Sequence, residues 1–310
     1  MKYQNLYLLL SSVMISSCNS GSNGTTGNNY SLDTFAIMPI SSTVCSSGQF
    51  FSPSLLKINT DSGSSAYCSP YIQQQTGESA LNTNVINDIV NYYYGSSYTL
   101  ENSCPAIGYQ SGITFPISSQ YSLDIQQIID SAISCVDSAM TTSNVSNPIF
   151  VFDIDDTLTS GYEGSCQYGF GAYNSILWNS AENSSAFVRT PNMFKLLNYA
   201  FTNNIDVAFV TGRTIDKYAI TESNLIAAYP EYQSQIESIF TKGNTRFVLP
   251  SEESWTVDSY KNYARQSLIN QNYHIVLNIG DQYSDLNYIY PYSNQPYCSY
   301  KLPNFMYYIK

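Results

Sequence analysis

The chain has 310 residues, of which 43% are hydrophobic and 11% are charged, and its formal net charge at pH 7 is −11. This length and hydrophobic content are enough for one large domain or two modest ones with a proper core. The negative charge argues against nucleic acid as a partner, because clusters of Lys and Arg are what bind such a polyanion.

The amino terminus has the pattern of an export signal. Lys2 precedes an apolar run over residues 6–15, which is too short for a permanent membrane-spanning helix. The run ends in Ile15-Ser16-Ser17-Cys18, which resembles a bacterial lipobox, so residues 1–18 are expected to be a lipoprotein signal with Cys18 as the lipidation site. Ordinary secretory cleavage near this point is the alternative.

The mature protein is expected outside the cytoplasm under either hypothesis. It would be lipid-anchored to the bacterial outer membrane, or periplasmic or secreted. Residues 19–30 are rich in Asn, Gly, Ser and Thr and are expected to be a flexible tether. The six cysteines beyond Cys18 predict disulfides, but the sequence does not choose their pairing. They are Cys45, Cys68, Cys104, Cys135, Cys166 and Cys298.

Residues 31–147 are expected to form an extension of helices and loops without a chemical signature. Apolar residues at helical spacing predict a helix over 80–94, which Gly95 would end. They predict a second helix over 121–140, whose core-facing stripe would include Leu123.

A buried strand is predicted over residues 148–152, and it runs into an acidic turn. Its residues are mostly β-branched or aromatic, and three carboxylates follow within four positions: Asp153, Asp155 and Asp156. In an open α/β sheet such acids lie at the carboxyl end of a strand, where ligands bind, and hard oxygen ligands suit Mg²⁺. A solvated acidic turn is the alternative, and Asp156 is expected only to cap or solvate the turn.

Residues from about 161 to 190 are expected to form a small cap rich in Tyr, Gly and Asn. Its aromatic side chains, Trp178 among them, are candidates for stacking on a planar substrate group. The alternative is that they only pack the cap.

Helices and strands alternate through the rest of the chain. Thr190 and Pro191 are expected to begin a helix as its N-cap and first residue. The other predicted helices cover 215–229 and 256–271, and the predicted strands cover 205–210, 246–249 and 273–279. This alternation is typical of a parallel sheet with right-handed crossovers.

Three further polar motifs belong to these elements. Thr211-Gly212-Arg213 and Gly280-Asp281-Gln282-Tyr283-Ser284-Asp285 each follow a predicted strand, and Lys261 lies on a predicted helix. Strand ends of a parallel sheet meet at one edge, so these side chains are expected to converge on Asp153. Together they supply a nucleophile, a cation, oxyanion donors and a proton shuttle, which phosphoryl transfer from a small ester requires.

On these motifs the chain resembles the haloacid dehalogenase (HAD) superfamily, and within it the acid phosphatases of subclass IIIB, which include plant vegetative-storage-type and bacterial lipoprotein acid phosphatases. The resemblance runs from about residue 81 to the end, and its blocks are 152–158, 210–213, 221–225, 259–261, 279–286 and 300–309. It implies an α/β, HAD-like Rossmannoid core over 148–310, a parallel sheet with flanking helices and the cap inserted after the first motif.

The resemblance also implies the catalytic roles. Asp153 would attack phosphorus and become an aspartyl-phosphate, and Asp155 would act as general acid and then as general base. Thr211, the Gly212 amide and Lys261 would hold the phosphoryl oxygens.

Mg²⁺ is the cofactor that the resemblance implies. Its ligands would be the Asp153 carboxylate, the Asp155 backbone carbonyl and Asp281. Asp285 would orient metal-bound waters, and the cation would help to neutralise a dianionic ester. Arg213 is expected either to contact the substrate or to serve only as a salt-bridge partner.

The sequence therefore predicts an exported, membrane-tethered, Mg²⁺-dependent acid phosphatase for small phosphomonoesters. Nucleoside monophosphates would be substrates if the cap aromatics stack a base, and an alcohol could replace water as acceptor. The alternative is a catalytically silent surface lipoprotein with a storage or interaction role; some plant storage relatives have lost the nucleophilic aspartate, but Asp153 is present here. A homodimer and the roles of the insertions at 95–119 and 231–245 are left open.

Overall fold

The computed structural model describes residues 50–51, 68–69, 83–104, 114–142, 145–170, 174–184, 187–242, 246–249, 256–286, 298–304 and 306. The expected signal, the lipidation site Cys18 and the tether lie outside the described residues. Within the part of the chain that is described, no helix is both long enough and apolar enough to cross a membrane.

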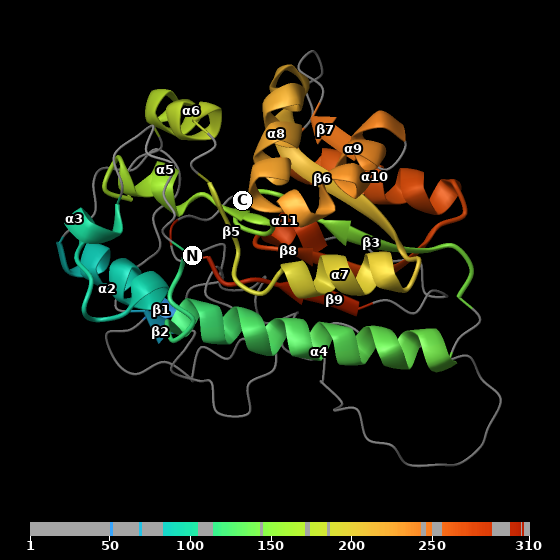
Figure 1. Cartoon of the computed structure of the whole chain (residues 1–310), viewed down its shortest axis with the longest axis horizontal. Coiled ribbons are helices and arrows are strands. Elements are labelled where there is room, and N and C mark those ends of the chain that lie inside the picture. Colours follow the sequence, from blue (N-terminus) through green and yellow to red (C-terminus); the bar gives the residue numbers. More distant parts are fainter. Residues whose placement is uncertain are drawn as a thin grey trace, which may run out of the picture.

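A parallel sheet forms the centre of the molecule (Figure 1). In the described residues it has five strands in the order β7-β6-β3-β8-β9. They are β3 (Pro148–Phe152), β6 (Asp206–Thr214), β7 (Arg246–Leu249), β8 (His274–Gly280) and β9 (Cys298–Lys301). The chain thus leaves the central strand β3 on one side and then returns to its other side, as in doubly wound α/β folds, which bind ligands at such a switch point. The predicted parallel sheet is confirmed.

Different helices cover the two faces of the sheet, because successive residues of a strand point to opposite faces. Phe150 and Phe152 of β3 pack into the cluster that contains the buried residues of α4 (Gln120–Thr142) and α7 (Phe194–Thr202). Figure 1 shows these two helices side by side. Val151 packs on the other side, against residues of α10 (Val257–Asn270). Burial on both faces explains why β3 is a continuous apolar run.

Helix α4 confirms the helix predicted over 121–140, but the placing of Leu123 in its core stripe is wrong. Ile125 and Ile129 are buried, whereas Leu123 is 51% exposed. Two residues turn an α-helix by about 200°, so Leu123 faces away from the side that carries Ile125.

The helix predicted to begin at Thr190 begins later. Helix α7 starts at Phe194, and residues 191–193 form a turn. Asn192 has a φ of 62°, a left-handed conformation that an α-helix cannot contain, so the chain becomes helical only after it.

The remaining predicted elements are found with small changes at their ends. Helix α2 (Thr83–Tyr94) ends at Gly95, whose φ of 97° suits glycine. The helix predicted over 215–229 is a short turn, η4 (Ile215–Lys217), followed by α8 (Tyr218–Ala228). Thr256 caps α10 by accepting a hydrogen bond from the Ser259 amide at 3.2 Å.

Several elements were not predicted. Helix α9 (Gln233–Lys242) occupies most of the insertion at 231–245, and its buried residues Ile236 and Phe240 stand at helical spacing, a pattern that could have revealed it. Outside the segment 159–189, the others are short: β1 (Phe50–Phe51), β2 (Cys68–Ser69), α3 (Leu100–Ser103), η5 (Pro230–Tyr232), α11 (Tyr283–Leu286) and β9.

The segment after the first acidic motif leaves the sheet and returns to it. Strands β4 (Thr159–Ser160) and β5 (Val188–Arg189) pair antiparallel at its two ends. Helices α5 (Tyr162–Cys166) and α6 (Ser175–Asn183) lie between them. We call residues 159–189 the cap; in Figure 1 its helices lie on the same side of the molecule as α2 and α3.

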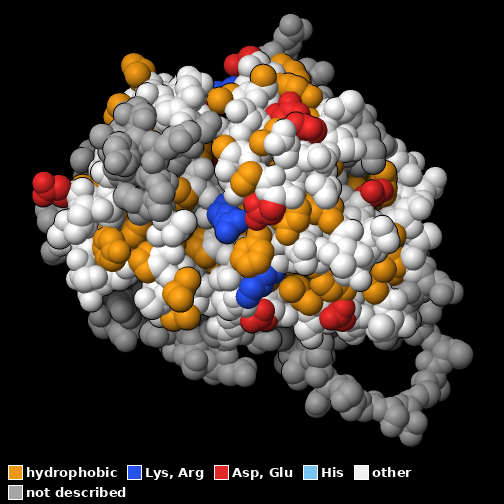
Figure 2. Space-filling view, in the orientation of Figure 1, with side chains coloured by type: hydrophobic (Ala, Val, Ile, Leu, Met, Phe, Trp, Pro, Cys, Tyr) orange, Lys and Arg blue, Asp and Glu red, His pale blue; other side chains and the backbone are white. Residues whose placement is uncertain are grey.

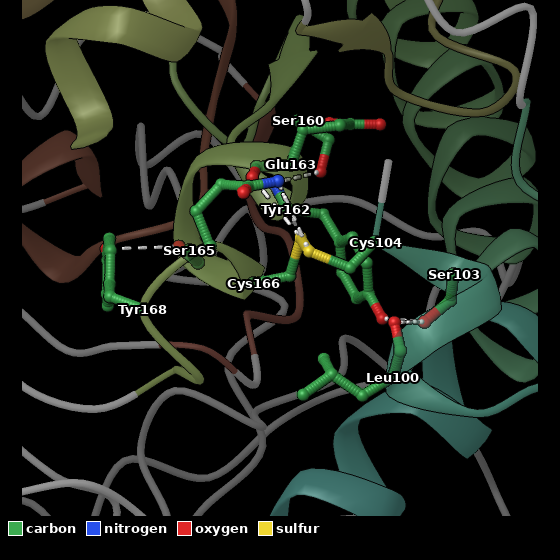
Figure 3. Close-up of a disulfide and its surroundings, with 10 residues drawn as sticks. Leu100, Ser103, Cys104, Ser160, Tyr162, Glu163, Ser165, Cys166 and Tyr168 are labelled. Carbon is green, nitrogen blue, oxygen red and sulfur yellow. Dashed lines mark hydrogen bonds between the residues drawn. A yellow bond between two sulfur atoms is a disulfide. The ribbon is translucent and has the colours of Figure 1, made fainter. Parts of the chain in front are cut away.

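Among the described residues, two disulfides fix the N-terminal extension to the rest. Cys104 after α3 is bonded to Cys166 of the cap, and Cys135 of α4 is bonded to Cys298 of β9. Next to the first bond the hydroxyl groups of Ser103 and Tyr162 are 2.9 Å apart (Figure 3). The predicted disulfides are confirmed for these four cysteines; Cys45 and the side chain of Cys68 lie outside the described part.

Removal of the second disulfide is expected to destabilise the fold. Its cysteines are 163 residues apart, so the bond restricts a large part of the unfolded chain. We expect the Cys135→Ala/Cys298→Ala variant to lose about 2–5 kcal/mol of unfolding free energy in urea titrations. The matched comparison is the Cys104→Ala/Cys166→Ala variant, which lacks a bond between cysteines only 62 residues apart. Its expected loss of unfolding free energy is about 1 kcal/mol smaller. An unchanged unfolding midpoint in the first variant would contradict this expectation.

Candidate active site

Acidic side chains meet at the carboxyl edge of the two central strands. Asp153 follows β3 and Asp281 follows β8, and the Asp153 amide donates to the Ile279 carbonyl at 3.1 Å. Asp285 lies on α11, directly after β8. Among the described residues, Asp153, Asp281 and Asp285 form a buried group in which one carboxylate oxygen from each residue lies within 4.8 Å of the other two. This carboxylate cluster occupies the switch point of the sheet.

Lys261 of α10 brings a positive charge into the carboxylate cluster. Its Nζ donates to Asp153 Oδ1 at 2.7 Å and also to Asp285. The Lys261 side chain is 5% exposed. Burial acts to lower the pKa of Lys261, but the Asp153 and Asp285 carboxylates raise it above its ordinary value. The lysine therefore stays charged and offsets part of the repulsion between the acids.

The carboxylate cluster still carries more negative than positive charge. Burial and then Asp285 raise the pKa of Asp153, and burial followed by Asp285 raises the pKa of Asp281 to about 7. Such raised pKa values mean that burial and mutual repulsion both disfavour the ionised acids here, so a cation or a proton would stabilise them. The donors are carboxylate oxygens, which are the preferred ligands of hard divalent ions, so the chemistry of the site fits Mg²⁺.

The Asp155 side chain pairs with Arg213 and is not one of the three acids of the carboxylate cluster. Arg213 Nε donates to Asp155 Oδ2 at 2.9 Å and Nη2 donates to Oδ1 at 2.6 Å, which is a two-pronged salt bridge. Asp155 keeps 20% exposure of its side chain, whereas that of Arg213 is 3% exposed. Arg213 thus makes the salt bridge that was one of its two predicted roles, and Asp155 is the acid with access to solvent.

Thr211 and Gly212 lie near the end of β6, the other neighbour of β3. Thr211 is fully buried and its hydroxyl accepts a hydrogen bond from the Arg213 amide at 3.0 Å. At Gly212 a Cβ would stand 3.2 Å from the Val257 side chain at the start of α10. A larger residue would press on the helix that carries Lys261.

Two polar residues beside the carboxylate cluster were given no role by the sequence analysis. Asn304 donates to Asp281 Oδ2 at 2.7 Å, and Lys301 is buried at the end of β9. Burial lowers the pKa of Lys301 to about 8, although Asp281 and Asp285 act to raise it. Both belong to the closing block 300–309, which carried part of the family resemblance and could have pointed to them.

Asp156 and Arg265 hold the loops of the site. Asp156 has a φ of 57° and accepts from the Gly161 amide at 2.8 Å, and it is buried, so it caps the turn and does not solvate it. Arg265 donates to the carbonyls of Ser284 and Asp285 at 3.0 and 2.8 Å. These contacts fix the backbone on both sides of the carboxylate cluster.

Trp178 lies buried inside the cap. Its ring packs edge-on against Phe187 with 5.1 Å between centroids. A Cβ at Gly161 would stand 2.3 Å from the indole, so only glycine fits beneath it. The indole N–H donates to Glu182 Oε1 at 3.3 Å. These contacts agree with the packing alternative for this aromatic, and stacking on a substrate stays a prediction.

Glu163 is a buried acid of α5, drawn beside the first disulfide in Figure 3. Burial raises its pKa from an ordinary value of 4.5 to about 8. The folded protein therefore keeps this proton up to a higher pH than the unfolded chain does. As the pH rises from about 5 to 8, Glu163 ionises in the unfolded chain but stays protonated in the folded protein. Ionisation stabilises the unfolded chain, so the free energy of unfolding falls over this pH range.

The Glu163→Gln variant is expected to remove that pH dependence. Gln is neutral and of similar shape, so variant and wild type should have similar free energies of unfolding near pH 4. At pH 8 the variant should be more stable by up to about 4 kcal/mol. Urea titrations across this range would measure the difference, with Glu101→Gln at an exposed position of α3 as control. A difference that does not grow with pH would show that Glu163 is already ionised in the folded protein.

Charged side chains are few on one face of the molecule. Figure 2 shows scattered acidic and basic side chains on the face drawn, with polar uncharged and apolar groups between them. This agrees with the charged fraction of 11% in the whole chain. The concentration of charge in the buried site therefore contrasts with this face.

Comparison with known proteins gives a family match over more than half of the chain. Residues 109–310 match the HAD superfamily, subfamily IIIB (Acid phosphatase). The chain is 35% identical over 165 residues to the Stem 28 kDa glycoprotein of Glycine max, and the match covers 52% of this chain and 60% of that relative. It is 26% identical over 192 residues to Acid phosphatase 1 of Solanum lycopersicum, covering 61% of this chain and 69% of the relative.

Among solved structures, the class C acid phosphatase from Bacillus anthracis is 17% identical, with a TM-score of 0.44. That match covers 59% of this chain and 77% of the Bacillus anthracis chain. Vegetative storage protein 1 of Arabidopsis thaliana is also similar, 29% identical over 164 residues, which is 52% of this chain and 55% of the relative.

Proposed function

Because the chain belongs to the acid phosphatases of HAD subfamily IIIB, we propose that it hydrolyses small phosphomonoesters with the help of Mg²⁺. The observation that carries this proposal is the contact of Lys261 with Asp153 at the switch point of the sheet, although 108 residues separate them. A buried acid paired with an ammonium group in this position is what attack on an anionic ester requires.

Asp153 and Asp155 would divide the chemistry between them. A carboxylate oxygen of Asp153 forms a bond to phosphorus while the bond from phosphorus to the ester oxygen breaks, and Asp155 gives its proton to the departing alcohol. Asp155 then takes a proton from a water molecule whose oxygen attacks phosphorus. This second displacement releases inorganic phosphate and returns Asp153 to its carboxylate form. Thr211, the Gly212 amide and Lys261 would hold the phosphoryl oxygens.

The Asp153 and Asp281 carboxylates and the Asp155 backbone carbonyl would hold the Mg²⁺ ion, and Asp285 would orient its waters. When bound, the cation supplies positive charge that offsets both the carboxylates and the dianionic ester. The raised pKa values of Asp153 and Asp281 support this assignment, because burial and the neighbouring Asp285 both disfavour the ionised acids unless a cation is present.

We further propose that the protein works outside the cytoplasm, anchored through Cys18. The disulfides Cys104–Cys166 and Cys135–Cys298 support an oxidising compartment. Nucleoside monophosphates belong to the proposed substrates if a cap aromatic stacks the base. A loss of preference for nucleotides over sugar phosphates in Trp178→Ala would support the stacking role, and unchanged selectivity would count against it.

Phosphate release from 4-nitrophenyl phosphate at mildly acidic pH tests the proposed activity. We expect release by the wild type, loss of release in excess EDTA, and recovery when Mg²⁺ is added back, because the carboxylate cluster needs a cation to accept an anionic ester. Activity that survives complete removal of divalent ions would contradict the metal assignment. No phosphate release under any of these conditions would instead support the alternative of a catalytically silent surface lipoprotein.

A further inference from the structure

A second group of charged side chains lies beside Asp155, outside the carboxylate cluster. Its centre is Glu182 of the cap helix α6, whose side chain is 2% exposed. One oxygen of Glu182 is 3.6 Å from Arg213 Nε, and the other accepts from Lys217 Nζ at 2.6 Å. Opposite charges therefore alternate from Lys217 through Glu182 and Arg213 to Asp155, and we call these four residues the charge chain.

The charge chain joins the cap to the core. Glu182, Asn179 and Trp178 all belong to α6, whereas Arg213 lies on β6 and Lys217 on η4. Trp178 donates to Glu182 at 3.3 Å, and Lys217 donates to Asn179 at 2.7 Å. Helix α6 thus presents the Glu182 carboxylate to the guanidinium group in a fixed orientation.

The buried guanidinium group needs this second carboxylate. Burial acts to lower the pKa of Arg213, but Asp155 and then Glu182 raise it, so the group stays charged. A buried charge is stable only if it is paired. Glu182 is therefore the cap residue that holds the Arg213 guanidinium group in place, and the two-pronged contact of that group with Asp155 fixes the orientation of the Asp155 carboxylate.

We propose that Glu182 is a positioning residue for the acid–base step: by holding the Arg213 side chain, this cap carboxylate fixes the orientation of the Asp155 carboxyl group. The inference rests on the proposed phosphatase activity and deepens it. It also gives Trp178 a role as the support of Glu182.

The test compares two esters that differ in their need for a proton donor. Glycerol phosphate releases a basic alkoxide that must be protonated, whereas 4-nitrophenyl phosphate releases an anion that leaves without help. The ratio kcat/KM covers the steps up to departure of the alcohol and excludes the later step in which Asp155 acts as a base for both esters. In Glu182→Gln we expect kcat/KM for glycerol phosphate to fall by about 10- to 100-fold, part of what a general acid contributes. The kcat/KM for 4-nitrophenyl phosphate should change less than about threefold, and Glu182→Asp should recover part of the loss.

The control is Glu231→Gln, because Glu231 pairs with Arg189 at 2.8 Å on the surface, where both side chains are 41% exposed. Its ratio of the two kcat/KM values should equal that of the wild type. An equal loss on both esters in Glu182→Gln, or no loss on either, would overturn the proposal. If the wild type releases phosphate from neither ester, it is the proposed function itself that fails.

A second variant covers the case in which Glu182→Gln does not fold. Lys217 is 25% exposed, so Lys217→Met should be tolerated. It removes the ammonium group that holds the other Glu182 oxygen. The ratio of kcat/KM for glycerol phosphate to kcat/KM for 4-nitrophenyl phosphate should therefore fall below the wild-type value. A ratio that is unchanged or raised would contradict the charge chain.

Discussion

Substitution of Asp153 by Asn is expected to abolish phosphate release, with kcat lowered by at least about 10⁴-fold, as when other enzymes lose their nucleophile. An amide cannot take the phosphoryl group, but it has the shape of the carboxylate. The substitution also removes one charge from an over-acidic cluster, so the variant should be at least as stable as the wild type. Initial rates and thermal unfolding measure the two effects.

The control for this variant is Asp130→Asn on the exposed side of α4, which should keep the wild-type rate. If Asp153→Asn retained more than a small fraction of the rate, the nucleophile would be another residue. The initial rate and the thermal unfolding are measured on the same sample, so that a lower rate caused by unfolding can be told apart from the loss of the nucleophile.

Substitution of Lys261 by Met is expected to give the largest loss of stability. Lys261 is buried and pairs with both Asp153 and Asp285, so its removal leaves these carboxylates without their ammonium partner. Breaking a buried ion pair in this way costs about 3–5 kcal/mol of unfolding free energy. Urea titration at neutral pH with EDTA present would measure the loss.

Mg²⁺ should recover part of that stability, because an ion that binds only the folded state stabilises it. Lys195→Met, at a partly buried lysine of α7, is the matched control and should lose no more than about 1 kcal/mol. If the two variants lost equal amounts, the pairing of Lys261 with the acids would contribute nothing to the fold.

The sequence was most informative where an element has a strong pattern of its own. The strand β3 and the helix α4 were predicted because one is a continuous apolar run and the other has apolar residues at helical spacing. Strand β9 was missed, since Cys298–Lys301 is short and partly polar and becomes a strand only by pairing with β8. The two-residue strands β4 and β5 likewise exist through their pairing with each other.

The site was predictable to the level of strand ends. Asp153 and Asp281 were expected to converge because parallel strands end at one edge of the sheet, and they do. The contact between Arg213 and Glu182 was not predictable, because it depends on how the cap folds over the sheet. The pairing of the cysteines was not predictable for the same reason. It depends on which segments become neighbours in the fold, and the spacing of the cysteines does not determine it.

The most direct test of the account is to locate the phosphoryl group during turnover. Wild-type protein is mixed with ³²P-labelled ester and Mg²⁺, quenched in acid within milliseconds and digested, and the labelled peptide is sequenced. The account predicts label on the peptide that contains Asp153 and none in Asp153→Asn. Label on another residue, or rapid turnover with no labelled peptide at any time, would contradict a mechanism in which this carboxylate accepts the phosphoryl group.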